Sequence, residues 1–441
     1  MPRTWQINAR PAALALGLLL ACSLSARPEE IPADPPLRWW KGNLHTHSLW
    51  SDGDDFPEMI AEWYREHGYH FLALSDHNVL AEGMRWIGVA EVEKRAGPQA
   101  LKEYLGRFGP HWVELRTNDA GAQEVRLKPL SEYRALVEER GRFLMIPSEE
   151  ISAACEGLPV HLNATNIEEV ISPLRGATVR ETIEANVRAV EDQARRRGRD
   201  ILVHLNHPNF GFAITAEDLA AVLSERFFEV YNGHTSVAQL GDGQHASVEY
   251  LWDVANTLRL VQFAAPPLFG LATDDSHDYH EGSGDNRSGR GWVMVRARHL
   301  TPESLLAAMR RGDFYASTGV TLRAVQYDPQ QGLLQVEIEP QGDQRYVTQF
   351  IGTLADFDPS SRPVTNEAGE PLRATRRYSA DVGRVLAEVE GPHAQYRLTG
   401  QELYVRAVVT SSQPHPDPSY QGQRQQAWTH PVGWERRVQA E

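Results

Sequence analysis

The sequence predicts a mixed α/β fold, with a large barrel-like parallel domain followed by a smaller antiparallel β domain. At 441 residues the chain exceeds one average domain, and its 41% hydrophobic content is enough for packed cores. Short apolar runs alternate with amphipathic stretches as far as about Gly319, which is typical of parallel α/β units. From Val320 onward, β-type alternation replaces helical periodicity.

Short apolar runs supply the strand candidates of the large domain, and several are apolar throughout, as strands buried on both faces are. The candidates are Trp39–His47, Phe71–Asp76, Phe143–Glu150, Val160–Thr165, Ile201–His207, Phe227–Tyr231, Leu268–Asp274 and Trp292–Val295. Amphipathic periodicity predicts helices between them. The expected helices are Glu58–His67, Glu132–Arg140, Val179–Arg197 and Pro302–Arg311.

Two further segments complete the predicted organisation. Val79–Gly141 is long for a connection between strands, so we expect an insertion there, with a helix and a hairpin that turns at Asn118–Gly121. In the C-terminal part, alternation in Leu333–Glu339 and Leu403–Thr410 predicts a small β sandwich. The predicted domains are residues 39–319 and residues 320–441.

The first 26 residues have the pattern of an export signal. Arg3 and Arg10 precede a short apolar run, Ala12–Ala21, which is too short to span a bilayer. The run ends in Leu-Leu-Ala-Cys, which resembles a lipoprotein box in which Cys22 would be lipidated; ordinary cleavage near Ser25 is the alternative. A Pro-rich linker over residues 27–38 follows. We therefore expect a periplasmic protein or an outer-membrane lipoprotein.

The charge of the chain disfavours one class of partner. The formal net charge is −15, and such a chain repels the backbones of DNA and RNA, which attract proteins through clustered Lys and Arg. A small anion drawn to bound cations stays open as a substrate. The sequence leaves the oligomeric state undetermined.

Histidines and carboxylates recur near the ends of the predicted strands. Because the carboxyl ends of parallel barrel strands meet on one face, we expect these side chains to gather there. Several buried imidazoles and carboxylates without an ion would be electrostatically costly, so the pattern predicts metal binding. The residues are His45, His47, Asp52, His77, Glu150, His161, His204, His207, Asp274, Asp275 and His277.

These blocks resemble the motifs of the polymerase and histidinol phosphatase (PHP) superfamily: His-x-His with a following Asp, Asp-His, Glu before Ile-Ser, His-Leu, His-Pro and a final Asp-Asp-Ser-His. Lys41–Gly53 and Asn206–Pro208 are similar, more narrowly, to the CehA/McbA-type metallohydrolases. The resemblance implies a distorted (β/α)7 barrel and a metal-dependent hydrolase that holds two or three divalent ions (Zn, Mn or Fe).

The resemblance also implies which residues hold each ion. The first ion would take His45, His47, Glu150 and either Asp274 or Asp275, the second Glu150, His161 and His207, and the third Asp52, His77 and His277. Asp275 has the usual spacing to His277, whereas Asp274 matches the strand end, so both stay open. Glu149 is the alternative to Glu150. Asp52 and His204 are the candidate catalytic residues, although His204 fits a partner of the ligands better than a catalytic acid.

The predicted reaction is hydrolysis of a phosphate monoester or diester by a hydroxide that bridges two ions. With three ions the site keeps a net charge of about +2, which suits a phosphate dianion. With two ions the charge is about zero, which suits a carbamate or carboxylic ester, the substrates implied by the similarity to carbaryl hydrolase. The insertion leaves the domain directly after His77, so we expect it to border the site and influence substrate choice.

Overall fold

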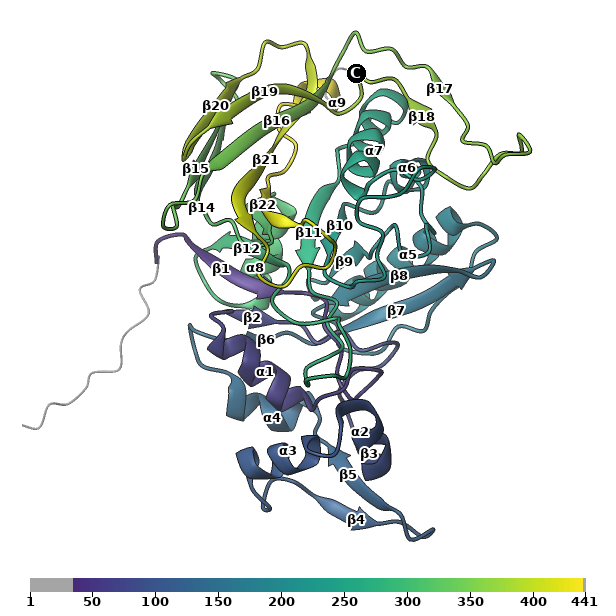
Figure 1. Cartoon of the computed structure of the whole chain (residues 1–441), viewed down its shortest axis with the longest axis vertical. Coiled ribbons are helices and arrows are strands. Elements are labelled where there is room, and N and C mark those ends of the chain that lie inside the picture. Colours follow the sequence, from purple (N-terminus) through teal and green to yellow (C-terminus); the bar gives the residue numbers. More distant parts are fainter. Residues whose placement is uncertain (1–34, 439–441) are drawn as a thin grey trace, which may run out of the picture. The chain divides into compact units, whose positions relative to one another are not determined.

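The computed structural model describes residues 35–438 (Figure 1). The expected export signal, including Cys22, lies outside the described residues and stays a prediction. From Leu37 onward the chain forms one compact unit. No helix among residues 35–438 is long and apolar enough to cross a membrane.

Helices form where amphipathic periodicity predicts them. α5 has the predicted bounds, Val179–Arg197; it begins after Thr178, whose side chain accepts the Glu181 N–H, and ends at Gly198 in the left-handed conformation. The other predicted helices are α1 (Pro57–Glu66), α4 (Leu130–Val137) and α8 (Pro302–Arg310). The remaining helices are α2 (Val89–Ala96), α3 (Ala100–Phe108), α6 (Ala216–Ala221), α7 (Val248–Gln262) and α9 (Glu435–Val438).

A five-stranded sheet contains the predicted ligands Glu150 and His161, and further predicted ligands follow two of its strands. Its order is β11 (Phe269–Thr273), β10 (Phe227–Asn232), β9 (Leu202–Leu205), β8 (Leu158–Thr165) and β7 (Ser148–Cys155). β9, β10 and β11 are parallel, but β8 runs antiparallel to both of its neighbours, so the expectation of a wholly parallel sheet is wrong. The reason is a tight turn at Glu156 and Gly157, whose positive φ angles of 51° and 81° reverse the chain.

A nine-stranded sheet begins with three parallel strands, β6 (Leu144–Met145), β2 (Phe71–Leu72) and β1 (Arg38–Asn43). It continues through antiparallel strands β12 (Trp292–Ala297), β13 (Phe314–Ser317), β22 (Arg424–Trp428), β21 (Glu402–Pro414), β16 (Tyr346–Leu354) and β19 (Arg384–Glu390). Hydrogen bonding of β13 with β22 carries this sheet across the boundary predicted after Gly319. That boundary stays a prediction.

The described strands do not close into a barrel. Instead, two isolated parallel bridges join the two large sheets, between Thr46 and Ser276 and between His77 and Glu150. The first bridge lies next to predicted ligands, and the second joins two of them. The sheets therefore approach each other at the point where the candidate site is built.

Smaller sheets flank these two. β14 (Leu322–Asp328), β15 (Leu333–Ile338) and β20 (His393–Arg397) share a buried apolar cluster with β16 and β21, although the sandwich as such stays a prediction. β17 (Ser361–Arg362) pairs with β18 (Arg377–Tyr378). In the insertion, β3 (Arg85–Gly88), β4 (Leu115–Thr117) and β5 (Gln123–Leu127) form a sheet. β4 and β5 form the predicted hairpin, and the insertion contains three helices, α2, α3 and α4, instead of one.

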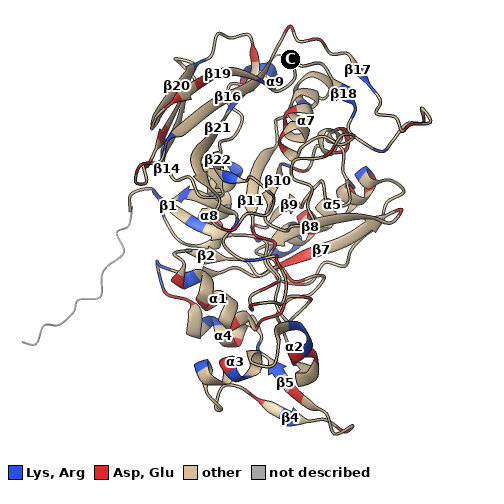
Figure 2. Cartoon of the chain, viewed as in Figure 1, with Lys and Arg blue, Asp and Glu red and all other residues tan. Residues whose placement is uncertain are grey.

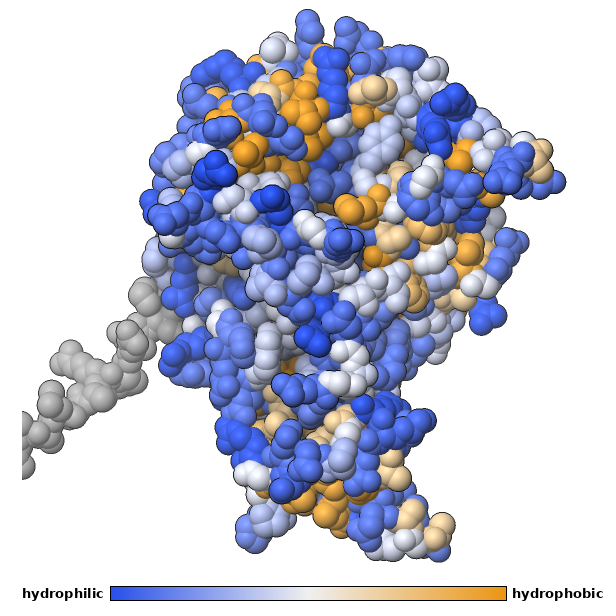
Figure 3. Space-filling view, viewed as in Figure 1, coloured by the Kyte–Doolittle hydropathy of each residue, from blue (hydrophilic) through white to orange (hydrophobic). Residues whose placement is uncertain are grey.

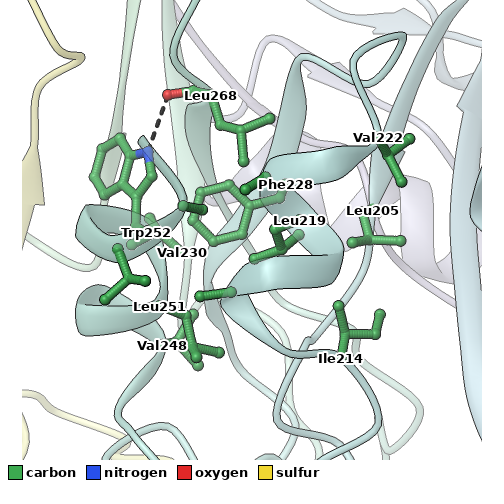
Figure 4. Close-up of a cluster of buried hydrophobic side chains, with 14 of the residues drawn as sticks. Leu205, Ile214, Leu219, Val222, Phe228, Val230, Val248, Leu251, Trp252 and Leu268 are labelled. Atoms are coloured by element: carbon green, nitrogen blue, oxygen red, sulfur yellow. Dashed lines mark hydrogen bonds between the residues drawn. The ribbon is translucent and has the colours of Figure 1, made fainter. Parts of the chain in front are cut away.

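The main core packs α6 and α7 on β10. Trp252 of α7 is fully buried and donates its indole N–H to the Leu268 carbonyl at 2.9 Å, beside Phe228 and Val230 of β10 (Figure 4). The face of the molecule drawn in Figure 3 is mainly hydrophilic, with scattered apolar patches. This core holds β9, β10 and β11 behind the candidate site.

Candidate metal centre

The histidines and carboxylates singled out in the sequence lie together where the two large sheets meet, and Figure 2 shows acidic residues at the start of β7 there. They form four groups, and the potential ligand atoms within each group lie within 4.8 Å of one another. The groups are His45, His47 and Glu150; His77, Glu150 and His161; His47, Asp52, His77 and His277; and His45, His204 and Glu229.

Around the first predicted ion position, two imidazoles face two carboxylates. The Nε2 atoms of His45 and His47 each lie 3.1 Å from Asp275 Oδ1. The same two atoms lie 3.5 Å from Glu150 Oε1 and Oε2, respectively. His45 and His47 alternate with Thr46 along the extended segment after β1, so their side chains share one side of the chain.

Around the second position, Glu150 Oε1 lies 3.0 Å from His161 Nδ1 and 3.4 Å from His207 Nε2. Two residues of the cluster adopt a left-handed backbone, His207 with φ 22° and Asp275 with φ 48°. Such conformations are strained for residues other than glycine and concentrate at functional sites. Here they turn a side chain into the cluster directly after β9 and β11.

The third position lies between three histidines and Asp52. Asp52 Oδ1 lies 3.5 Å from His277 Nε2 and 3.6 Å from His47 Nδ1, and Asp52 Oδ2 lies 3.4 Å from His77 Nε2. The His47 and His277 rings stack with centroids 4.1 Å apart. Partial burial would raise the pKa of Asp52, but hydrogen bonds with His277 and His77 outweigh it and hold that pKa below the usual range.

The residues present fit divalent cations. His45 Nε2, His47 Nε2 and Glu150 Oε2 are buried and have no hydrogen-bond partner, although opposite charges lie close by. Burial first, and then His277, lower the pKa of His47 to about 3, so its ring is neutral, as a metal ligand must be. No Lys or Arg among residues 35–438 forms an ion pair with Glu150, Asp275 or Asp52, and the described partners of these carboxylates are histidines, which are also metal ligands.

The structure separates the two aspartates of the last motif. Both Asp274 oxygens accept hydrogen bonds away from the cluster, from the Tyr64 hydroxyl at 2.7 Å and from the backbone N–H groups of residues 289–291. Asp275 instead faces His45 and His47. Asp274 is therefore a structural carboxylate, and Asp275 is the candidate ligand.

Glu149 faces away from the cluster, and His204 belongs to the group that it forms with His45 and Glu229. Glu149 points to the opposite side of β7 from Glu150 and accepts the Ile171 N–H at 2.5 Å. His204 is fully buried behind His45, with Nε2 3.5 Å from Glu229 Oε1. A fully buried ring cannot reach a substrate, so His204 is better suited to support the ligands than to act as a catalytic acid.

Glu229, in the middle of β10, is a site residue that the motif pattern missed. It accepts hydrogen bonds from His45 Nδ1 and the His207 N–H, each at 2.7 Å, and from Thr273 and Asn232. His45 Nδ1 therefore carries the proton, which leaves the Nε2 lone pair free to face the cluster. A signal existed: Glu229 is the one charged residue in an otherwise apolar strand candidate, where an unpaired charge is costly.

Two ligands occupy a different place in their strands from the expected one. The sequence places Glu150 at the end of a strand, but it is the third residue of β7, and His161 is the fourth of the eight residues of β8. In the β7–β8 hairpin, antiparallel pairing sets Ser152 opposite His161, so Glu150, two residues before Ser152, faces the same side of the sheet as His161.

No family model matches the chain, and no curated protein matches it. Among solved structures, the chain is similar to a two-domain protein from Bacteroides vulgatus ATCC 8482 that contains a predicted PHP-like metal-dependent phosphoesterase, with 13% identity and a TM-score of 0.39, over 91% of this chain and 98% of that one. It is also similar to a proposed metal-dependent phosphoesterase from Bifidobacterium adolescentis ATCC 15703, with 14% identity and a TM-score of 0.29, over 63% of this chain and 98% of that one.

Proposed function

We propose that this chain is a metal-dependent hydrolase of the PHP type that acts on phosphate esters, monoesters or diesters. The observation that carries the proposal is the convergence of unpartnered imidazole nitrogens and carboxylate oxygens at the meeting point of two sheets. The residues that would hold ions are His45, His47, Asp52, His77, Glu150, His161, His207, Asp275 and His277.

Divalent ions held by these residues would lower the pKa of a bound water toward 7 and stabilise negative charge that develops on the substrate. The chain itself orients the ligands. Asn206 donates to Glu150 Oε1 at 2.8 Å, which restricts the rotation of that carboxylate. Asn232 links Asp275 to Glu229, with contacts of 3.0 and 2.8 Å. Such partners set the direction of ligand lone pairs.

The charge of the site favours a phosphate ester as the substrate. The ion pairs that the cluster carboxylates form within residues 35–438 are with histidines and not with Lys or Arg. Bound ions are then the largest local charges, and three of them would leave the site with a charge of about +2. A small anionic ester fits this charge, and the net charge of −15 disfavours nucleic acid.

The test compares two neighbouring residues of β7. In Glu150→Gln, the bridging carboxylate is lost, and we expect metal content and hydrolysis of aryl phosphates to fall together. Substitution of a residue that only hydrogen-bonds to a metal ligand lowers metal affinity or activity about 10–100-fold. The loss in Glu150→Gln should exceed that range. Glu149→Gln is the matched control, because it is equally buried but faces Ile171. Metal analysis and phosphatase assays check both variants.

Either of two results would contradict the proposal. A Glu150→Gln protein with the metal content and turnover of the parent would remove Glu150 from the centre. A parent protein that binds no divalent ion after purification and metal supplementation would refute the metal centre as a whole.

A further inference from the structure

Asp52 is the most exposed member of the third group, with 55% of its side chain exposed, against 27% for His77 and 16% for His277. The Ser51 hydroxyl donates to Asp52 Oδ1 at 3.2 Å and histidines face the carboxylate from the cluster side, so the backbone of the loop sets how far the carboxylate extends toward them. That loop lies tight against the cluster: a Cβ on Gly53 would stand 2.7 Å from the His47 backbone. The placement of residues 51–53 therefore decides whether Asp52 reaches the ion position.

Arg95, on α2 of the insertion, holds this loop from outside. Its Nη1 donates to the Ser51 carbonyl at 2.6 Å and lies 3.5 Å from the Gly53 carbonyl, so the guanidinium contacts the peptide groups on both sides of Asp52. The Nε of Arg95 donates to Glu91 one helical turn earlier, at 2.8 Å. The i, i+4 pair fixes the direction of the guanidinium.

The rest of the insertion is docked on the segment that follows the loop. The rings of Tyr104 (α3) and Phe56 stack with centroids 3.8 Å apart. The Tyr104 hydroxyl and the Trp112 indole both donate to Glu58 in the first turn of α1, at 2.7 and 2.9 Å. Figure 1 shows α2 and α3 together beside this region. These contacts fix the position of the insertion, and therefore the position of Arg95 relative to the loop.

We propose that the insertion, through Arg95, holds Asp52 in place for the third ion and thereby selects phosphate esters over neutral esters. The inference rests on the proposed function. Loss of the third ion removes two positive charges from the site, and the remaining charge of about zero no longer favours a dianion. Arg95 touches neither ions nor substrate in this scheme, so it is a positioning residue.

The experiment uses the full chain and four variants: Arg95→Ala, Asp52→Asn, the double variant, and Lys94→Ala as the matched control. Lys94 neighbours Arg95 on α2, is 77% exposed and pairs only with Glu91 among the described residues. Bound metal is measured after dialysis against a fixed concentration of Mn²⁺ or Zn²⁺. Initial rates are measured on an aryl phosphate and on the aryl acetate with the same leaving group.

We expect Arg95→Ala to lose one ion equivalent and at least tenfold in the ratio of phosphate to acetate rates. The acetate rate itself should change less than about twofold. Because Arg95 acts through Asp52, the double variant should match Asp52→Asn in both readouts. Lys94→Ala should match the parent.

Three ions and an unchanged rate ratio in Arg95→Ala would overturn the inference while leaving the proposed function intact. Additive losses in the double variant, or loss of all ions at once, would also overturn it, since they indicate general destabilisation. Should Arg95→Ala fail to fold, Arg95→Lys, which can replace only one donor, provides the same comparison. A parent that binds no ions and hydrolyses neither ester would refute the proposed function itself.

Discussion

At the scale of single residues, Glu229 shows how the fold accommodates a buried carboxylate. Burial would raise the pKa of Glu229, but His45 first and then His204 outweigh it and keep the carboxyl ionised. Its oxygens accept four hydrogen bonds, two of them from His45 and the His207 backbone. One side chain of β10 therefore positions a predicted ligand of the first ion and one of the second.

Glu229→Gln should weaken metal binding by about 10–100-fold, the usual range for partners of metal-bound histidines. The amide NH₂ of glutamine would face one of the present donors, so either His45 or the His207 loop loses its orientation. Titration of the metal-free protein with Mn²⁺ or Zn²⁺ measures the effect. Glu225→Gln is the control, because within residues 35–438 that buried carboxyl accepts hydrogen bonds only from the backbone N–H groups of Arg226 and Phe227. Equal affinity in Glu229→Gln and the parent would show that Glu229 does not position the ligands.

At the scale of secondary-structure elements, the contact between α1 and the insertion contains a buried titratable group. Glu58 is fully buried in the first turn of α1, between Tyr104 and Trp112. Burial raises its pKa from 4.5 to about 7, against the opposing effect of its hydrogen bonds with those two residues. The insertion is thus attached through a carboxyl group that folding disfavours in its charged form.

The stability of the metal-free protein should therefore depend on pH through Glu58. The folded-state pKa is raised, so the stabilising contribution is present below pH 4.5 and is lost as pH rises through about 7. Glu58→Gln keeps an acceptor but does not ionise. Relative to the parent, this variant should gain about 2 kcal/mol in free energy of unfolding between pH 5 and pH 8. Urea unfolding at both pH values, after chelation, checks this; a constant difference between the two proteins would contradict it.

At the scale of the whole molecule, a buried ion pair joins elements on either side of the predicted domain boundary. Arg406 of β21 forms a bidentate contact with Asp253 of α7, at 2.8 and 2.6 Å, and the Tyr404 hydroxyl donates to the same carboxylate. Both charged side chains are almost completely buried. Together with the continuous nine-stranded sheet, this contact predicts that the two parts of the chain unfold in one transition.

Arg406→Leu should lower the free energy of unfolding by about 3–5 kcal/mol, because it leaves the Asp253 charge buried without its partner. In the double variant Arg406→Leu/Asp253→Asn, the orphaned charge is gone, so the loss should be smaller than the sum of the two single losses. Urea unfolding followed by tryptophan fluorescence measures all four proteins. Strict additivity, or two separate transitions in the parent, would count against this coupling.

The sequence by itself determined which residue types would meet, because residue identity and close spacing, such as His45-x-His47, are local properties of the chain. It also determined helices α1, α4, α5 and α8 and the strands around the site, since periodicity reports which side of an element is buried, but it did not indicate α6 and α7. Only the tertiary structure decided between neighbours: Glu150 and Asp275 face the cluster, while Glu149 and Asp274 face away. Adjacent residues in extended chain point to opposite sides, and which side is inward depends on strand pairing across the sheets. The antiparallel direction of β8 and the hydrogen bond from Arg95 to the Ser51 carbonyl likewise arise from contacts between segments distant in sequence.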